Sequence, residues 1–349
     1  MDSQMLRGRL KCIRDGMVRL KADCLIVTKP ANVTYVTGFM GEDSWAVVLP
    51  RGVILVTDSR YSEQAASQCR LCGIVVRKDA MAKAVAGLLR NRRGIKMVAV
   101  EKSTSIAEFG GLRKHLPCRV KAVEKVVESA RRTKDAGEIA AIRAAAKIAG
   151  RAFERALRRV RAGLTENEVA GVIDFEIRRA GGRNSFDTIV AFGPNASRPH
   201  HQPTARKLRK NDTVLIDFGV RHKGYCCDIT RCFAVGKPAG FFNKVYAAVN
   251  EARLAALAMV RSGVEIKRVD AAAKAVIRKY GLPVYGHGTG HGLGLEVHEM
   301  PSVSAKSEGI LQAGDVITIE PAVYIPGRLG LRIEDDVLVT KGGCVVLSE

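Results

Sequence analysis

Short apolar runs alternate with amphipathic segments over the N-terminal part of the chain. The runs are rich in β-branched residues, as is typical of strands between turns, and we expect strands over residues 24–28, 33–39, 45–49, 53–58, 73–77 and 97–101. Apolar residues recur at helical spacing over 61–72 and 79–93, and Ser103 is expected to cap a third helix that ends near His115. Alternating strands and helices predict an α/β N-terminal domain.

The pattern changes at the charged segment 123–138, after which a long amphipathic helix is expected. Apolar residues, mostly alanine and isoleucine, recur there at helical spacing until Gly163. A chain of 349 residues is also longer than one typical domain. We therefore predict two domains, with residues 1–124 in the first and residues 125–349 in the second.

The second domain contains an internal repeat. Residues 161–182 align with residues 261–282 without a gap, and the later segment RKNDTVLIDFG resembles LQAGDVITIEP. A duplicated α+β unit with a pseudo-two-fold axis explains both matches. The aligned pairs include Gly163 with Gly263, Gly181 with Gly281, Asp212 with Asp315, and Asp217 with Glu320.

Composition narrows the class of protein. Hydrophobic residues make up 47% of the chain and charged residues 26%, which suits a folded core. No apolar run reaches the length of about 18 residues that a membrane span needs, so no membrane partner is expected. The charged N-terminus lacks the apolar stretch of a signal peptide, so we expect a cytoplasmic protein. Its nine cysteines, Cys69 and Cys72 among them, are expected to be reduced thiols.

The net charge of +22 raises the question of a nucleic acid partner. The Lys and Arg residues are scattered through segments such as RNRRGIK and RALRRVR, with few aromatic residues between them. No nucleic-acid-binding motif occurs. We therefore do not expect a nucleic acid partner.

Each half of the repeat contains two carboxylates in apolar, strand-like segments. VLIDFG contains Asp217 and VITIEP contains Glu320, while Asp228 and Glu334 lie in the next apolar segment of each half. Both spacings suit two antiparallel strands joined by a short turn, which would bring the two carboxylates of a half onto one face. The pseudo-two-fold axis would then bring all four together.

Four carboxylates in one place repel one another or become protonated unless cations neutralise them. Two divalent ions balance four negative charges, so the pattern predicts a dinuclear metal site. An oxygen-rich set of ligands with one nitrogen suits Mn²⁺ or Co²⁺, which we expect first, or Zn²⁺ or Fe²⁺.

The segment HGTGHGLGLEVHEMP contains the candidate nitrogen ligands. His287 and His291 have the four-residue spacing with which a helix binds zinc. Glycines alternate through the segment, however, and each costs a helix about 1 kcal/mol relative to alanine. We therefore predict that the segment is not helical. The residues themselves leave the choice among His287, His291 and His298 open.

The chain resembles the pita-bread metallopeptidases, and among them the Xaa-Pro peptidases, which are Xaa-Pro dipeptidase (prolidase) and Xaa-Pro aminopeptidase. The resemblance implies a creatinase-like α/β N-terminal domain followed by an α+β pita-bread catalytic domain. It rests on NVTYVTGFMG, TDSRYSEQA, RTKDAGEIAAIRAA, RPHHQPTARKLRKNDTVLIDFG, DITR, GTGHGLGLEVHEMP, IEPAVYIPG and GLRIEDDVLVT.

The resemblance also implies which residues bind the metal ions. The ligands would be Asp217, Asp228, His291, Glu320 and Glu334. His291 is thereby chosen over the other two histidines of its segment. Glu320 would in addition accept a proton from the attacking water and pass it to the leaving nitrogen.

Further roles follow from the resemblance for three histidines and one arginine. His200 would contact the substrate near the scissile bond, with the adjacent His201 as the alternative. His287 would help to hold the proline side, and His298 would stabilise the tetrahedral intermediate or the departing proline nitrogen. Arg332 is expected beside the metal carboxylates and in contact with the substrate.

The expected activity is metal-dependent hydrolysis of the Xaa-Pro bond at the N-terminus of peptides or in dipeptides. The sequence leaves dipeptidase and aminopeptidase open. Methionine aminopeptidase is disfavoured because those enzymes generally lack the large N-terminal domain. The alternative is a non-catalytic pita-bread module that binds peptide or protein, but such relatives have lost metal ligands, whereas all five positions are present here. A homodimer is expected because the family is commonly dimeric.

Overall fold

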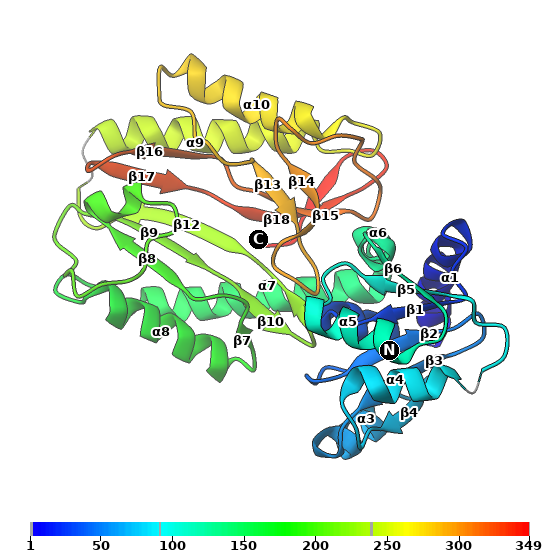
Figure 1. The fold of residues 1–349 in the computed structure, drawn as a ribbon. Coiled ribbons are helices and arrows are strands. Elements are labelled where there is room, and N and C mark those ends of the chain that lie inside the picture. The colour runs from blue at the N-terminus through cyan, green and yellow to red at the C-terminus, as the bar shows by residue number, and fades with distance from the viewer. Residues whose placement is uncertain (1–2, 91, 238–239, 349) are drawn as a thin grey trace. The chain divides into compact units, whose positions relative to one another are not determined.

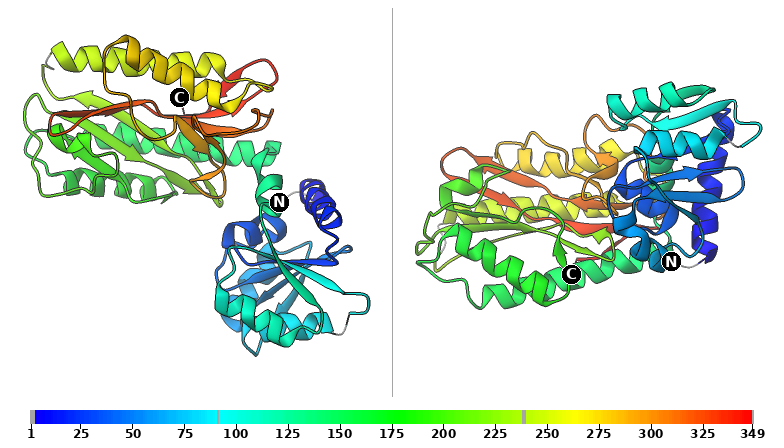
Figure 2. Two further views of the ribbon diagram at one scale, coloured as in Figure 1. Left: turned by 45° about the horizontal axis from the view of Figure 1, so that its top comes forward. Right: turned by 60° about the horizontal axis from the view of Figure 1, so that its bottom comes forward.

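The computed structural model describes residues 3–90, 92–237 and 240–348. The chain divides into two compact units, Met1–Arg131 and Arg132–Glu349. Figures 1 and 2 show the elements of each unit. The assignment of residues 1–124 and 125–349 as the two domains stays a prediction.

The first unit is built on a six-stranded mixed sheet with the order β4-β3-β2-β1-β5-β6. Strand β2 is antiparallel to both its neighbours, whereas β1–β5, β3–β4 and β5–β6 are parallel pairs. The predicted α/β class is therefore confirmed. The elements are α1 (Ser3–Arg19), β1 (Cys24–Val27), α2 (Pro30–Thr37), β2 (Trp45–Val48), β3 (Val53–Thr57), η1 (Ser59–Tyr61), α3 (Ser62–Gln68), β4 (Gly73–Val76), α4 (Met81–Arg90), β5 (Met97–Glu101), α5 (Ile106–His115), β6 (Arg119–Val123) and α6 (Val126–Arg132).

One expected strand is a helix. Residues 33–39 lie mostly in α2, which packs against β2. Pro30 occupies the first turn, where its missing N–H costs no hydrogen bond. Gly38 ends the helix in the left-handed region at φ 80°, and its N–H donates to the carbonyl of Thr34. Burial of this face and the two end signals outweigh the β-propensity of the VTYVT segment.

Three helix ends also differ from the prediction. The helix expected over 61–72 is α3, which ends at Gln68, and α7 ends at Leu157. Helix α5 is capped by Ser105, two residues after the expected cap. Ser105 and Glu108 form a reciprocal capping box, which satisfies two backbone N–H groups at once.

The second unit contains two similar halves, each with two helices and a set of antiparallel strands. Helices α7 and α8 cover one side of the strands and α9 and α10 cover the other (Figures 1 and 2). This confirms the predicted α+β pita-bread architecture. The first half contains α7 (Ala136–Leu157), α8 (Glu166–Arg179), β7 (Arg183–Asn184), β8 (Ile189–Phe192), η2 (Gly193–Ser197), β9 (Thr213–Phe218), β10 (Val220–His222), β11 (Tyr225–Cys226) and β12 (Ile229–Ala234). The second contains α9 (Gly240–Met259), α10 (Ile266–Lys279), β13 (Gly290–Gly292), β14 (Glu299–Val303), β15 (Val316–Ile319), β16 (Ala322–Ile325), β17 (Leu329–Arg332), β18 (Asp335–Val339) and β19 (Cys344–Val346).

The halves repeat each other in local geometry as well as in element order. Helices α8 and α10 both have 14 residues and occupy aligned positions. Gly163 and Gly263 precede them with φ values of 96° and 87°, which only glycine adopts without strain. Asp212 and Asp315 each accept the backbone N–H of the residue three positions earlier. The internal repeat predicted from the sequence is therefore confirmed.

Apolar side chains fill the space between the helices and the strands of each half. In the first half, α7 and α8 pack on β8 and β9 through residues such as Ala149, Ile173 and Val214. In the second half, α9 and α10 pack on β15 and β18 through residues such as Val249 and Ile277. Among the helices of the described residues, none combines the length and the apolarity that crossing a bilayer requires.

Candidate metal centre

The first pair of carboxylates lies on one long hairpin that runs from β9 through β10 and β11 to β12. The pairs Thr230↔Asp217 and Arg221↔Cys226 belong to one register, because both strands advance by four residues between them. Between these two residue pairs the regular strand pairing is interrupted at Asp228. Since Asp228 lies two residues before Thr230, it shares a face with Asp217.

The second pair lies on the corresponding hairpin of the other half. Ile319, the last residue of β15, pairs with Asp335, the first residue of β18, and β16 and β17 continue in the same register. That register places Glu320 opposite Glu334. Glu320 and Glu334 therefore lie where regular strand pairing is interrupted, as Asp228 does in the first half, whereas Asp217 lies within the paired part of β9.

His291 lies in β13 between two glycines that let this strand pack closely on its neighbours. A Cβ atom at Gly290 would lie 1.9 Å from the carbonyl oxygen of Thr318, and one at Gly292 would lie 2.1 Å from that of Met300. The segment is a short strand and not a helix, as predicted. The glycines therefore bring the His291 side chain against the carboxylates of the neighbouring hairpins.

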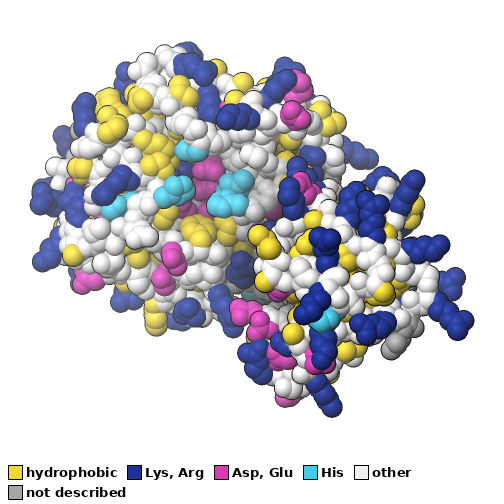
Figure 3. Space-filling view, in the orientation of Figure 1, with side chains coloured by type: hydrophobic (Ala, Val, Ile, Leu, Met, Phe, Trp, Pro, Cys, Tyr) yellow, Lys and Arg dark blue, Asp and Glu magenta, His cyan; other side chains and the backbone are white. Residues whose placement is uncertain are grey.

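The five predicted ligands are brought together in one cluster. Ligand atoms of Asp217, Asp228 and Glu334 all lie within 4.8 Å of one another, and the same holds for His291, Glu320 and Glu334. Nε2 of His291 lies 3.6 Å from Oδ2 of Asp228 and 3.6 Å from Oε1 of Glu320. Figure 3 shows histidine side chains around a recessed acidic patch on this face.

Burial and mutual repulsion oppose ionisation of these carboxylates. Burial is the main cause that raises the pKa of Asp228 and of Glu334 well above the usual range, and neighbouring carboxylates raise both further. Burial likewise raises the pKa of Glu320 to about 7. It lowers the pKa of His291 to about 4, so this imidazole is neutral at pH 7 and can serve as a ligand. Divalent cations would reverse the penalty on the carboxylates.

Two unusual features of the cluster fit a metal ion. Oδ1 of Asp217 and Oδ1 of Asp228 are buried and have no hydrogen-bond partner among the described residues. Nδ1 of His291 lies 3.1 Å from the carbonyl oxygen of Gly292. A proton on Nδ1 leaves the lone pair of Nε2 facing the carboxylates, which is the arrangement of metal-bound histidines.

Arg332 is buried beside the cluster and held by protein groups. Its Nη2 donates to Oδ2 of Asp217 at 2.5 Å, its Nε to the hydroxyl of Thr230 at 3.0 Å and its Nη1 to the hydroxyl of Tyr324 at 2.6 Å. Thr230 in turn donates to Glu334 at 2.6 Å. Neither Thr230 nor Tyr324 was predicted from the sequence as part of the site. The only sequence signal for Thr230 is its spacing of two from Asp228, which puts both on one strand face.

The structure distinguishes the adjacent histidines 200 and 201. His201 is buried, and its Nε2 lies 2.9 Å from Oε2 of Glu166. His200 is exposed, and the carbonyl of the preceding residue, Pro199, accepts from Nη1 of Arg332 at 3.5 Å. Burial is the main cause that lowers the pKa of His287 to about 4, and His200 is among the smaller contributors. His200 is therefore the member of the pair that is near the cluster and available to a ligand.

The other two histidines also lie at the cluster. The ring of His298 packs edge-on against that of His291, with ring centroids 4.3 Å apart. Nδ1 of His287 lies 3.8 Å from Oε2 of Glu320, and its ring lies 4.8 Å from that of Tyr285. The predicted site residues thus lie near one another in the structure, although they extend from His200 to Glu334 along the chain.

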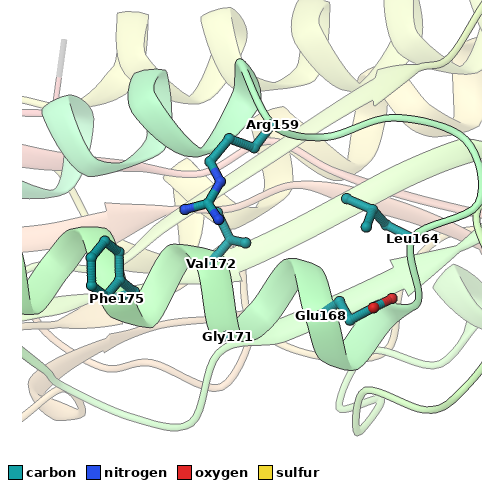
Figure 4. Close-up of a pocket in the computed structure, with 6 residues that line it drawn as sticks. All are labelled: Arg159, Leu164, Glu168, Gly171, Val172 and Phe175. Atoms are coloured by element: carbon teal, nitrogen blue, oxygen red, sulfur yellow. The ribbon is translucent and has the colours of Figure 1, made fainter.

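A separate cavity of about 370 Å³ lies along α8 (Figure 4). It contains one carboxylate, Glu168, which is engaged in the capping box of α8 with Thr165. None of the clustered residues contributes to it, so we assign the chemistry to the carboxylate cluster. The lining residues are Arg159, Leu164, Glu168, Gly171, Val172 and Phe175.

Comparison with known families agrees with this geometry. Residues 140–341 match metallopeptidase family M24, and residues 9–133 match the creatinase/prolidase N-terminal domain. The chain belongs to metallopeptidase family M24. It is 36% identical over 341 residues to the uncharacterized peptidase YqhT of Bacillus subtilis. The aligned region covers 96% of this chain and 96% of that protein.

Solved structures with the same two-domain architecture carry two different activity names. The chain is similar to a Xaa-Pro dipeptidase from Bacillus anthracis (TM-score 0.95, 32% identity, 99% of this chain and 98% of that one). It is also similar to an X-Pro aminopeptidase from Thermotoga maritima (TM-score 0.90, 33% identity, 96% of this chain and 98% of that one). These similarities support a metallopeptidase and do not distinguish the two types.

Proposed function

We propose that this chain is a Xaa-Pro peptidase that depends on two divalent metal ions. The observation that carries the proposal is that two groups of ligands share Glu334. Asp217 and Asp228 complete one group, and His291 and Glu320 complete the other. Adjacent groups with a common carboxylate suit two ions a few ångströms apart, with Mn²⁺ or Co²⁺ preferred over Zn²⁺ or Fe²⁺.

Bound ions would supply polarisation of the scissile carbonyl and acidify a water molecule for attack. Glu320 is proposed to accept the proton of that water and to pass it to the leaving proline nitrogen. Its side chain is 17% exposed, so it can reach a substrate. His298, packed on His291, is proposed to donate to the developing oxyanion.

The remaining histidines are proposed to hold the peptide. His200 is assigned to the region of the scissile bond and His287 to the proline side, next to Tyr285. The contacts of Arg332 support a role in orienting Asp217, because its donors already bond to protein acceptors. Contact between Arg332 and the substrate stays a prediction.

The test combines metal content with product analysis. Purified protein is stripped by chelation, titrated with Mn²⁺, Co²⁺ or Zn²⁺, and assayed with Met-Pro and Met-Pro-Gly. We expect two ions per chain and release of the residue before proline. Cleavage of the dipeptide alone would mean a dipeptidase, and cleavage of the tripeptide to leave Pro-Gly would mean an aminopeptidase. Folded protein that holds two ions and cleaves neither peptide would overturn the proposal in favour of a binding module.

The expected homodimer and cytoplasmic location stay predictions. Light scattering coupled to size-exclusion chromatography measures the first, and fractionation of the source cells measures the second.

A further inference from the structure

Two buried carboxylates outside the metal cluster hold the loops that carry His200 and His287. One is Glu166, the first residue of α8, and the other is Asp270 in α10. Both side chains are almost completely buried. A buried carboxylate must be matched by hydrogen bonds, so the donors that each one selects define the conformation of its surroundings.

Glu166 accepts five hydrogen bonds from the segment between residues 192 and 204. Its Oε1 accepts from the N–H of Phe192 and from Nδ2 of Asn195, both at 2.8 Å. Its Oε2 accepts from the N–H and the hydroxyl of Thr204 at 3.0 and 2.5 Å, and from Nε2 of His201 at 2.9 Å. Although burial opposes ionisation, these bonds together lower the pKa of Glu166. One buried carboxylate therefore accepts hydrogen bonds from both ends of this loop.

His200 lies inside the closed loop. Its neighbour His201 is tied to Glu166, and on its other side the carbonyl of Pro199 accepts from Nη1 of Arg332 at 3.5 Å. The residues immediately before and after His200 are thus each hydrogen-bonded, Pro199 through its carbonyl and His201 through its side chain, while the His200 side chain remains exposed. This arrangement leaves the imidazole accessible and limits its positions.

Asp270 does the same for the loop that carries His287. Its Oδ1 accepts from the N–H of Thr289 at 3.0 Å, from the Thr289 hydroxyl at 2.8 Å and from Nζ of Lys274 at 3.0 Å. Lys274 in turn donates to the carbonyl of His287 at 2.9 Å. The Thr289 hydroxyl lies 2.6 Å from that of Tyr285, against which the His287 ring packs. His287 is therefore held from both sides.

Glu166 and Asp270 each hold a loop that carries a histidine, but the internal repeat does not align these two residues with each other. In the aligned helices Glu166 corresponds to Ile266, and Asp270 corresponds to Ala170. The two carboxylates are offset by one helical turn and therefore point from the same face of their helices. We propose that Glu166 and Asp270 are positioning residues, one in each half, that set the places of His200 and His287 for the reaction. This inference rests on the proposed peptidase function.

The test uses Glu166→Gln and Asp270→Asn, with Glu176→Gln as the matched control. Glu176 is a buried glutamate on α8, but its partners are Arg155 and Arg179. We expect kcat/KM to fall about 100-fold in the two positioning variants, since a displacement of about 1 Å has this cost. The metal content should remain that of the wild type, and E176Q should keep the wild-type kcat/KM.

Double variants separate positioning from general stability. E166Q should cause no further loss when His200→Ala is already present, and D270N none when His287→Ala is present, because each pair acts as one unit. Additive losses in the folded double variants would overturn the proposal. If E166Q does not fold, Thr204→Val removes one of the five donors and keeps the carboxylate. It should lower kcat/KM by about tenfold and retain the same coupling to His200.

A readout without activity keeps this proposal distinct from the proposed function. In metal-free protein, the histidine ring resonances measured by NMR should shift for His200 in E166Q and for His287 in D270N. E176Q should shift neither. Unchanged histidine ring resonances in folded E166Q and D270N would contradict the positioning role even if the protein is an active peptidase. Shifted resonances in a protein that cleaves no peptide would support the positioning role of Glu166 and Asp270 and would contradict only the proposed peptidase function.

Discussion

The two halves of the catalytic unit share a scaffold but contribute different chemistry to it. The first half places two aspartates diagonally across its hairpin, and the second half places two glutamates opposite each other. The second half alone supplies His291 and the two histidines near it, whereas the first supplies His200 from a loop. The comparison indicates that a duplicated backbone can be kept while its side chains diverge, because the register sets where a ligand lies and the residue type sets how far it reaches.

The largest expected effect concerns the ligand shared by the two groups. Glu334→Gln should bind neither ion tightly and lose more than about 10³-fold in kcat/KM, since loss of one electrostatic stabiliser already costs about 10²–10³. Asp217→Asn removes a ligand of only one group and should retain one ion. Calorimetric titration and elemental analysis measure the stoichiometry. Two ions in E334Q would contradict the shared carboxylate.

The aligned aspartates should differ in their contribution to stability. The side chain of Asp315 is fully buried against Arg132, whereas that of Asp212 is 13% exposed beside Arg206. Asp315→Ala removes a fully buried carboxylate that accepts from Arg132 and from the N–H of Gln312, and should cost about 2–4 kcal/mol. Asp212→Ala should cost about 1–3 kcal/mol, because water can replace part of the lost bonding. Urea unfolding gives both values, and equal costs would show that the halves are energetically equivalent here.

The glutamates of the second half should make the metal-free protein sensitive to pH. The pKa of Glu320 is raised to about 7 and that of Glu334 is raised as well, so the folded state holds protons that the unfolded state has lost. The contribution of these glutamates to the free energy of unfolding should therefore fall as pH rises through about 7. His287 and His291, whose pKa values are lowered to about 4, act in the opposite direction, but their contribution is nearly complete above the ordinary histidine pKa of about 6.5. Between about pH 7 and about pH 8 we therefore expect a net loss of about 1 kcal/mol.

Urea unfolding at about pH 7 and about pH 8, with chelator or with Mn²⁺, measures the effect. Bound ions should abolish the loss, because they hold the carboxylates ionised in the folded state. Metal-free protein that gains stability over the same window would contradict the assigned direction of the pKa shifts.

The smallest effects are expected at the paired glycines. Gly163→Ala and Gly263→Ala each force a Cβ into the left-handed region and should each cost about 1 kcal/mol, equally in the two halves. Gly171→Ala is the matched control, because this glycine lies in α8 with nothing near its Cβ position. It should stabilise the protein by about 0.5–1 kcal/mol. Thermal unfolding of the three variants measures the differences in stability. Unequal losses of stability at positions 163 and 263 would show that the two halves share the order of their elements but not the energetics of these turns.

Much of the cluster could be predicted because its information is local. Asp217 and Asp228 are eleven residues apart on one hairpin and Glu320 and Glu334 are fourteen residues apart on the other, so strand pairing brings each pair together, and the repeat relates the two pairs. The contacts of Thr230, Tyr324 and Glu166 could not be predicted in this way. Each depends on a partner that reaches it from a distant element, and Ser, Thr, Tyr and Glu occur on many surfaces without such partners.

The amino-acid sequence by itself determined the α/β and α+β classes, the duplication, the four clustered carboxylates and the absence of a helix around His291. Each follows from periodicity, register or glycine content, which act over a few neighbouring residues. Only the tertiary structure decided that residues 33–39 form a helix, that His201 is an anchor while His200 remains exposed, and that Arg332 is held by Asp217 and Tyr324. These outcomes depend on which donors and acceptors are buried together, and burial is a property of the packed chain.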